Sequence, residues 1–183
     1  DIVAIRTAHG SVLVRALITP RQRSGSLFVP IHWSERFASR ARVSTLIPPL
    51  IDPVSGQPAS KSARVFAQRW PAQAYAFVVA AERPSDLPLD EHTYWACART
   101  SGGWQIELAS LEQPSALLSR CERLLGSTWR RFPQATLSTY RDAGTGTHRF
   151  VARDRTRTVA AAFVSARPVA AARRWAGDLL IRT

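Results

Sequence analysis

Two short segments of the chain carry side chains suited to a polar, ring-bearing, phosphorylated ligand. His32 and Trp33 are adjacent at the end of an apolar run; the indole offers a flat face and one N–H donor, and the imidazole offers two ring nitrogens. The later segment 52–58 can present polar groups from a rigid frame, and Lys61 adds a cation for phosphate. Taken singly, each of these residues is more simply explained by a structural role.

The sequence contains no independent catalytic set. The histidines are scattered, and no serine or cysteine in an elbow motif accompanies Asp90-Glu91-His92. Neither of the glycine-rich motifs that cradle nucleotide phosphates occurs, and Gly144-Thr145-Gly146 is typical of a hairpin turn. We therefore assign no catalytic residue and expect the chain not to be catalytic alone.

The two cysteines do not indicate a metal centre. Cys97 and Cys121 lie in separate predicted elements. A zinc or iron–sulfur site needs about four soft ligands at close spacing. We expect two buried thiols in a reducing cytoplasm, with neither metal nor iron–sulfur ligands in this chain.

The strongest signal is an ordered series of residues in the first third of the chain. It comprises Gly25-x-x-Phe28-Val29-Pro30-x-His32-Trp33, Ala41-x-Val43, Leu46 and Asp52-Pro53-Val54-Ser55-Gly56-Gln57-Pro58-x-x-Lys61. From about Val12 to Val65 the chain resembles the last domain of molybdopterin oxidoreductases, and it is most similar to the bacterial assimilatory nitrate reductase branch. In that family this segment belongs to a double-psi β-barrel. The barrel covers the bis-molybdopterin guanine dinucleotide (bis-MGD) cofactor.

The resemblance implies six cofactor-binding residues. His32, Trp33 and Ser34 match the strand end that faces the cofactor, and Ser44 matches a pterin-binding position. Gln57 and Lys61 match a later loop that approaches the cofactor. The family usually has Asn-x-Leu-Thr where this chain has Ser44-Thr45-Leu46-Ile47, and serine offers one hydroxyl where asparagine offers a donor and an acceptor. A barrel that survives without binding the pterin stays an open alternative.

Residues 69–183 resemble, more loosely, the extension that follows this barrel in assimilatory nitrate reductases. The shared features are Tyr94-Trp95-Ala96, Gly103-Trp104 before Glu107-Leu108-Ala109, and Tyr140-Arg141-Asp142 before His148-Arg149-Phe150. The resemblance implies a piece of a cytoplasmic enzyme that reduces nitrate to nitrite at molybdenum, with the remaining domains of the same enzyme as partners. The absence of methionine and the start at Asp1 fit such a fragment.

The elements expected in the first region are short strands joined by loops. Strands are predicted at 2–6, 12–19, 27–32 and 63–68, with a short helix or helical turn in 33–41 and a long structured loop at 48–60. Almost no helix and many proline- and glycine-containing loops favour a barrel. We place this domain at 1–68 as the C-terminal part of a double-psi-like barrel.

The second region, 69–183, is predicted to be a small α+β unit, so that the whole chain has a mixed, mainly-β fold. Strands are expected at 74–81, 93–99, 104–109, 135–141, 149–153 and 158–165, and helices from Pro114 and from Pro168. The predicted inward residues are Leu117, Leu118, Cys121, Leu124, Leu125 and Trp129 on the first helix, and Val169, Ala172, Trp175, Leu179 and Leu180 on the second. The order strand-strand-strand-helix occurs twice, which suggests a degenerate duplication with both helices on one sheet face.

The charge of the chain suggests an acidic partner. Twenty-four arginines and a single lysine face 13 acids, for a net charge of +12. No aromatic and basic cluster matches a known nucleic-acid module, and no apolar run is long enough for a membrane span. A second hypothesis is therefore a basic interaction module that docks an acidic electron donor of the ferredoxin or flavodoxin type. Its predicted contacts are Arg120, Arg123, Arg130 and Arg131 on the first helix and Arg173 and Arg174 on the second.

Overall fold

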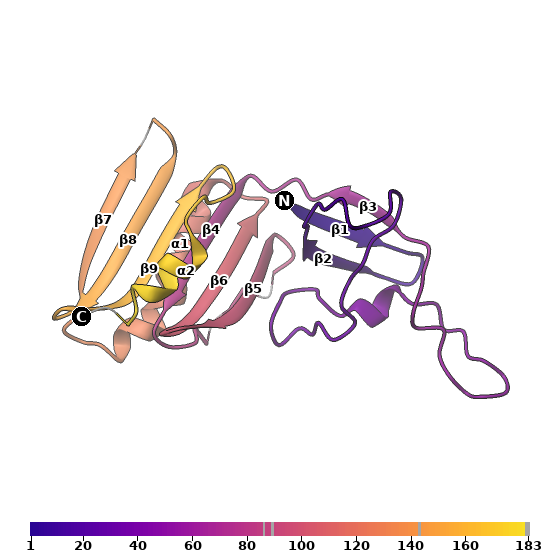
Figure 1. The fold of residues 1–183 in the computed structure, drawn as a ribbon. Coiled ribbons are helices and arrows are strands. Elements are labelled where there is room, and N and C mark those ends of the chain that lie inside the picture. Colours follow the sequence, from indigo (N-terminus) through magenta and orange to yellow (C-terminus); the bar gives the residue numbers. More distant parts are fainter. Residues whose placement is uncertain (86, 89, 143, 182–183) are drawn as a thin grey trace. The chain divides into compact units, whose positions relative to one another are not determined.

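The computed structural model describes residues 1–85, 87–88, 90–142 and 144–181; it leaves the side chains of residues 127, 129 and 130 undescribed. The chain forms two compact units, Asp1–Trp70 and Pro71–Thr183. Two separate β-sheets and few helices make up these units (Figure 1). The predicted mixed, mainly-β fold class is confirmed. No helix among the described residues is long and apolar enough to cross a membrane.

The first unit is built on a three-stranded antiparallel sheet. Its central strand is β1 (Ile2–Arg6), which pairs with β2 (Ser11–Arg15) on one side and β3 (Phe66–Arg69) on the other. A single turn of 3-10 helix, η1 (Val43–Leu46), packs against this sheet. The buried side chains of Ile5, Val12, Val43 and Leu46 form the small core between sheet and η1.

Three expectations for the first unit require correction. The strand predicted at 27–32 does not form, and Phe28 is 79% exposed. Pro30 lacks the N–H that a paired strand needs, and the apolar run meets no neighbouring strand. The second strand ends at Arg15 rather than at Thr19. The three described strands form an open sheet, so they do not close the expected barrel by themselves.

The second unit has a six-stranded antiparallel sheet covered by two helices. Its strands are β4 (Ala74–Ala80), β5 (Thr93–Thr100), β6 (Gly103–Ser110), β7 (Thr136–Asp142), β8 (Thr147–Asp154) and β9 (Arg157–Ser165). Their order across the sheet is β5-β6-β4-β9-β8-β7. The helices are α1 (Pro114–Arg130) and α2 (Arg173–Asp178) (Figure 1).

The helices lie on opposite faces of this sheet, whereas the sequence predicted one face. Ala76 and Val78 of β4 pack in a core with Leu117 and Leu125 of α1. Phe77 and Val79 alternate with Ala76 and Val78 along β4 and face the other side of the sheet. They pack with Ala176 of α2 and with Leu180, which follows α2. All seven residues of β4 are buried. A continuous apolar strand is the pattern of a strand covered on both faces, and 74–80 carried that signal.

The predicted duplication is wrong in its connectivity. The order of elements does repeat, as βββα followed by βββα. In the first half the first strand, β4, pairs with the third strand, β6; in the second half the first strand, β7, pairs with the second, β8. Two halves with different strand pairing cannot superpose as copies of one unit.

The first helix agrees with its prediction better than the second. Pro114 begins α1, and Leu117, Leu118, Cys121, Leu124 and Leu125 are buried. The side chain of Trp129 lies outside the described residues. The second helix begins at Arg173 rather than Pro168, and Trp175 is 46% exposed. The carbonyls of Val169 and Ala171 accept hydrogen bonds from the Arg173 guanidinium. Val169 and Ala171 therefore belong to the segment before the helix and not to its first turn.

Candidate cofactor-binding site

His32, Trp33 and Ser34 lie on an exposed turn of the first unit. The Trp33 amide donates to the Pro30 carbonyl at 3.4 Å, and the Phe37 and Ala38 amides donate to the Ser34 carbonyl at 3.0 and 3.3 Å. The last bond closes the helical turn predicted after Trp33. The side chains of all three residues are exposed, and Trp33 is 42% exposed. A flat indole at the surface is available to stack on another ring.

Ser44 is presented by η1. Its neighbours Val43 and Leu46 are buried, which fixes the turn on the sheet, while Ser44 itself is exposed. The Thr45 hydroxyl donates to the Arg42 carbonyl at 2.8 Å and closes the turn. Gly10, in the β1–β2 turn, allows the close approach of η1, because a Cβ there would lie 2.8 Å from the Thr45 carbonyl oxygen. The Ser44 hydroxyl therefore has a defined place.

Gln57 and Lys61 belong to the loop between η1 and β3, which extends away from the sheet (Figure 1). Asp52 organises this loop: its Oδ1 accepts from the Ser55 amide at 2.7 Å, the Ser55 hydroxyl at 3.0 Å and the Val54 amide at 2.9 Å. These hydrogen bonds, the Ser55 amide first, lower the pKa of the Asp52 carboxyl. The Asp52 amide donates to the Gln57 carbonyl at 2.9 Å. The loop is therefore structured, as predicted.

The six predicted residues share exposure but not one cavity. His32–Ser34, Ser44 and the pair Gln57 and Lys61 come from three segments of the same unit. Among the described residues, no hydrogen bond or ion pair joins a side chain of one group to a side chain of another. The structure thus places all six at the surface. It does not by itself assemble them around a ligand.

The donor chemistry of these residues fits a phosphorylated pterin. They offer an imidazole, an indole, two hydroxyls, a carboxamide and an ammonium group, and none is a carboxylate. One oxygen of the nearby Asp52 carboxylate accepts hydrogen bonds from donors of its own loop. An incoming phosphate would therefore meet hydrogen-bond donors and the Lys61 cation, while the Asp52 carboxylate is bonded within its own loop.

An unusual number of large apolar side chains of the first unit are exposed. They are Leu17, Ile18, Leu27, Phe28, Ile31, Trp33, Phe37, Leu50, Ile51, Val54, Val65 and Phe66. Single exposed apolar residues are ordinary. A unit of 70 residues that exposes so many large apolar side chains normally has part of its surface covered by a partner.

The arginines predicted to dock a partner are only partly available. Arg120 pairs with Asp90 at 2.5 Å and Glu112 at 2.6 Å, and its side chain is 21% exposed. Arg173 pairs with Glu107, and Arg131 pairs with Glu82. Arg123 and Arg174 are exposed, and the side chain of Arg130 lies outside the described residues. Arg120 and Arg173 therefore serve inside the unit, and the predicted docking set is wrong for these two residues.

Both cysteines are free and buried in the core of the second unit. Burial raises the pKa of the Cys97 thiol, and it raises that of Cys121 to about 12. Thiols held in this way stay protonated at neutral pH, whereas metal ligation needs the thiolate. No group of three or more potential metal ligands occurs among the residues that the structure describes.

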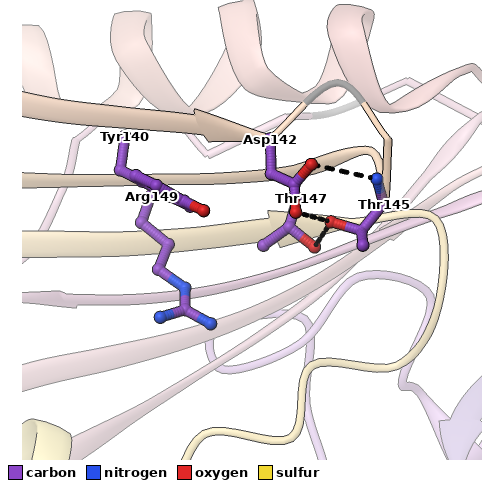
Figure 2. Close-up of a pocket in the computed structure, with 5 residues that line it drawn as sticks. All are labelled: Tyr140, Asp142, Thr145, Thr147 and Arg149. Atoms are coloured by element: carbon purple, nitrogen blue, oxygen red, sulfur yellow. Dashed lines mark hydrogen bonds between the residues drawn. The ribbon is translucent and has the colours of Figure 1, made fainter.

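A shallow cavity of about 460 Å³ lies on the β7–β8 ribbon of the second unit (Figure 2). Tyr140, Asp142, Thr145, Thr147 and Arg149 line it. The Thr145 hydroxyl donates to Asp142 at 2.7 Å, and this bond, with the Thr145 and Gly144 amides, lowers the pKa of the Asp142 carboxyl. The carboxylate is thus occupied by its own hairpin turn. None of the six predicted cofactor residues lines this cavity.

Comparison with known proteins shows which class of protein the first unit resembles. Residues 1–64 match the family model described as the Molydopterin dinucleotide binding domain. This range contains all six predicted residues. Residues 1–64 are therefore similar to the molybdopterin dinucleotide-binding family.

A particular relative extends the likeness beyond that domain. The chain is 34% identical over 109 residues to a nitrate reductase of Klebsiella oxytoca; the match covers 60% of this chain and 12% of the relative. A match of that length cannot lie within the 70 residues of the first unit alone, so it includes part of the second. The predicted resemblance to the C-terminal region of a nitrate reductase is confirmed. No solved structure matches the chain.

Proposed function

We propose that this chain is the portion of a bacterial assimilatory nitrate reductase that helps to hold bis-MGD. The single observation that carries the proposal is the family match over residues 1–64, which contain His32, Trp33, Ser34, Ser44, Gln57 and Lys61. In the intact enzyme the cofactor would supply the two-electron reduction of nitrate to nitrite at molybdenum. The protein would supply binding, orientation and electrostatics.

Each predicted residue has a role that follows from its chemistry. Trp33 would stack on a ring of the cofactor, and His32 and Ser34 would hydrogen-bond its polar edge. Ser44 would reach the pterin edge, directly or through a water molecule. Lys61 would pair with a phosphate, and Gln57 would bond a phosphate or base beside it.

The two units would have different tasks. Residues 1–68 would form the C-terminal part of the cofactor-binding barrel, and residues 69–183 the extension found in this type of enzyme. The exposed apolar side chains of the first unit would be covered by the remaining domains of the same enzyme. Strands from those domains would also complete the barrel that three strands leave open.

The location and partners follow from the same assignment. An assimilatory enzyme would work in the cytoplasm, where the two free thiols suit a reducing environment. Its electron donor would be an acidic protein of the ferredoxin or flavodoxin type, since the chain carries a net charge of +12. The alternative function is docking of that acidic partner by a basic module that binds no cofactor itself.

The proposal is tested by nitrate reduction with the full-length enzyme. The enzyme would be purified anaerobically and supplied with a low-potential reduced dye and nitrate. Formation of nitrite, dependent on molybdate in the growth medium, is the expected result. A molybdenum-loaded enzyme that turns over a different oxyanion and leaves nitrate untouched would remove the substrate assignment while leaving the cofactor assignment in place.

A further inference from the structure

The topology of the second unit gathers four arginines at one end of its sheet. The β5–β6 turn and the β8–β9 turn lie at the same end, because β6 and β9 both start there and both run antiparallel to β4 (Figure 1). Arg99 stands at the first turn, and Arg153, Arg155 and Arg157 stand at the second. These four residues, distant in sequence, are called here the arginine end.

The arginine end is exposed and free of internal ion pairs in the described part of the chain. All four side chains belong to exposed residues. No salt bridge of the described residues includes any of them, in contrast to Arg120 and Arg173. Arg155 holds a backbone φ of 56°, which makes the β8–β9 connection a tight, protruding turn. The four cations are therefore accessible to solvent at these two turns.

One further cation, Arg83, lies beside this set. The guanidinium groups of Arg83 and Arg99 lie 5.3 and 4.4 Å from the centre of the Trp104 ring. Trp104 faces Arg99 across the β5–β6 pair, so the indole fixes the position of this cation. Among the residues that the structure describes, the acids near this end are Glu82, which pairs with Arg131, together with Asp154 and Asp178. The described arginines outnumber these acids.

The opposite end of the same sheet is different. Asp90, Glu91 and Glu112 lie where β5 begins and β6 ends, and Asp142 lies at the end of β7 on the far edge of the sheet. Asp90 and Glu112 there neutralise Arg120, and Asp142 closes its own turn. Three of these acids are thus engaged within the unit, whereas the four arginines at the other end take part in no ion pair of the described residues.

We propose that the arginine end is a docking surface for an acidic protein. From β5 to β8 the sheet spans four strand spacings, or about 20 Å, which is the width of a small protein contact. Guanidinium forks match carboxylates in a bidentate way. The interspersed Asp154 suits a protein surface of mixed charge better than the evenly charged phosphates of a nucleic acid. Trp104, already flanked by two arginines, leaves no open ring for a base to stack on.

The acidic partner thus has a defined place on this chain. Only the identity of that partner rests on the proposed function. None of the residues of the arginine end belongs to the cofactor-binding unit. The arginine end also replaces the helix arginines that the sequence suggested as the docking site. Cofactor content and docking can therefore succeed or fail separately.

The test uses the full-length enzyme and an acidic [2Fe–2S] ferredoxin as the probe. A variant carrying Arg153→Gln, Arg155→Asn and Arg157→Gln is compared with a control carrying Arg123→Gln, Arg167→Gln and Arg174→Gln, which removes the same charge from exposed sites elsewhere in the unit. Asparagine is chosen at Arg155 because it tolerates a positive φ. Unfolding midpoints and bound molybdenum are measured on each preparation, and Arg99→Gln serves as a second variant on the other turn.

The expected result is about tenfold weaker ferredoxin binding at low ionic strength for the hairpin variant, a smaller loss for Arg99→Gln, and little change for the control. Binding should also fall steeply as salt rises. Equal losses in the hairpin variant and the control, or no binding by the wild type at low salt, would overturn the proposal. So would tighter, hairpin-dependent binding of a single-stranded DNA of about 20 nucleotides. A cofactor-free enzyme that still docks would instead argue against the proposed function alone.

Discussion

Arg173 and Glu107 are joined across 66 residues of sequence by a forked ion pair that attaches α2 to β6. The Arg173 Nε donates to Glu107 Oε1 at 2.7 Å and Nη2 donates to Oε2 at 3.0 Å, and the guanidinium carbon lies 4.5 Å from the centre of the Phe77 ring. Nη1 donates to the Val169 and Ala171 carbonyls. One side chain thus fixes the segment before α2 and holds this six-residue helix on the sheet.

Arg173→Ala should therefore destabilise the second unit. The Glu107 side chain is 18% exposed and would lose its forked ion pair, so we expect a loss of about 2 kcal/mol in the free energy of unfolding. The matched control is Arg174→Ala on the exposed side, which should change stability by less than about 0.5 kcal/mol. Urea unfolding of the chain measures both, and equal effects would contradict the role assigned to Arg173.

The position of η1 predicts an effect of Gly10. In Gly10→Ala the new Cβ would lie 2.8 Å from the Thr45 carbonyl oxygen, so η1 and Ser44 must shift, at a cost of about 1–3 kcal/mol. Gly126→Ala in α1 is the control, since a Cβ there meets nothing within 4 Å and a helix favours alanine. Thermal unfolding should show a loss for the first variant and no loss for the second.

Much of the fold was predictable because local patterns decided it. Alternating or continuous apolar runs and glycine turns marked β1 and β4–β9 within a few residues. The segment 27–32 had an apolar pattern as well, yet it pairs with nothing in this structure, and pairing is not a local property. Which face each helix covers depends on connections across the sheet, so the α2 side was missed even though 74–80 read as buried throughout.

The candidate site shows the same division. The ordered motif predicted the six residues by resemblance, and the exposure of all six is consistent with a binding role that awaits a test. The helix arginines were misjudged because the pattern of one helix predicts which side chains face away from the core. It does not predict whether an acid from a distant segment pairs with them. Asp90 lies 30 residues before Arg120, and Glu107 lies 66 before Arg173. No sequence spacing signals such pairs.

The buried thiols predict how stability depends on pH. Burial raises the pKa of Cys121 in the folded state from 9.0 to about 12, and it also raises that of Cys97. Above pH 9 the unfolded chain releases these protons while the folded chain keeps them, so stability present below pH 9 should be lost as pH rises toward 12. A Cys97→Ala, Cys121→Ala double variant should show a weaker alkaline loss in urea unfolding. An unchanged alkaline slope would contradict this.

Ser44 tests how the site differs from the family pattern. Ser44→Asn restores a donor and an acceptor on an exposed position of η1, so cofactor retention in the full-length enzyme should rise if the pterin lies there. The measurement is guanine nucleotide released per chain after gel filtration in high salt. If the wild type is already fully loaded, Ser44→Asn should lose the cofactor more slowly than the wild type. If the wild type is poorly loaded and Ser44→Asn retains no more cofactor, the result would favour a barrel that no longer binds the pterin.

The central claim is that the first unit contacts bis-MGD, and cofactor content tests it most directly. Molybdenum and released guanine nucleotide are measured per chain in full-length wild type, in Lys61→Gln, and in Arg64→Gln, which removes an exposed cation nearby. We predict the amounts of a bis-dinucleotide site in the wild type and in Arg64→Gln, and about tenfold weaker retention in Lys61→Gln. A wild type that carries neither molybdenum nor guanine nucleotide would contradict the claim.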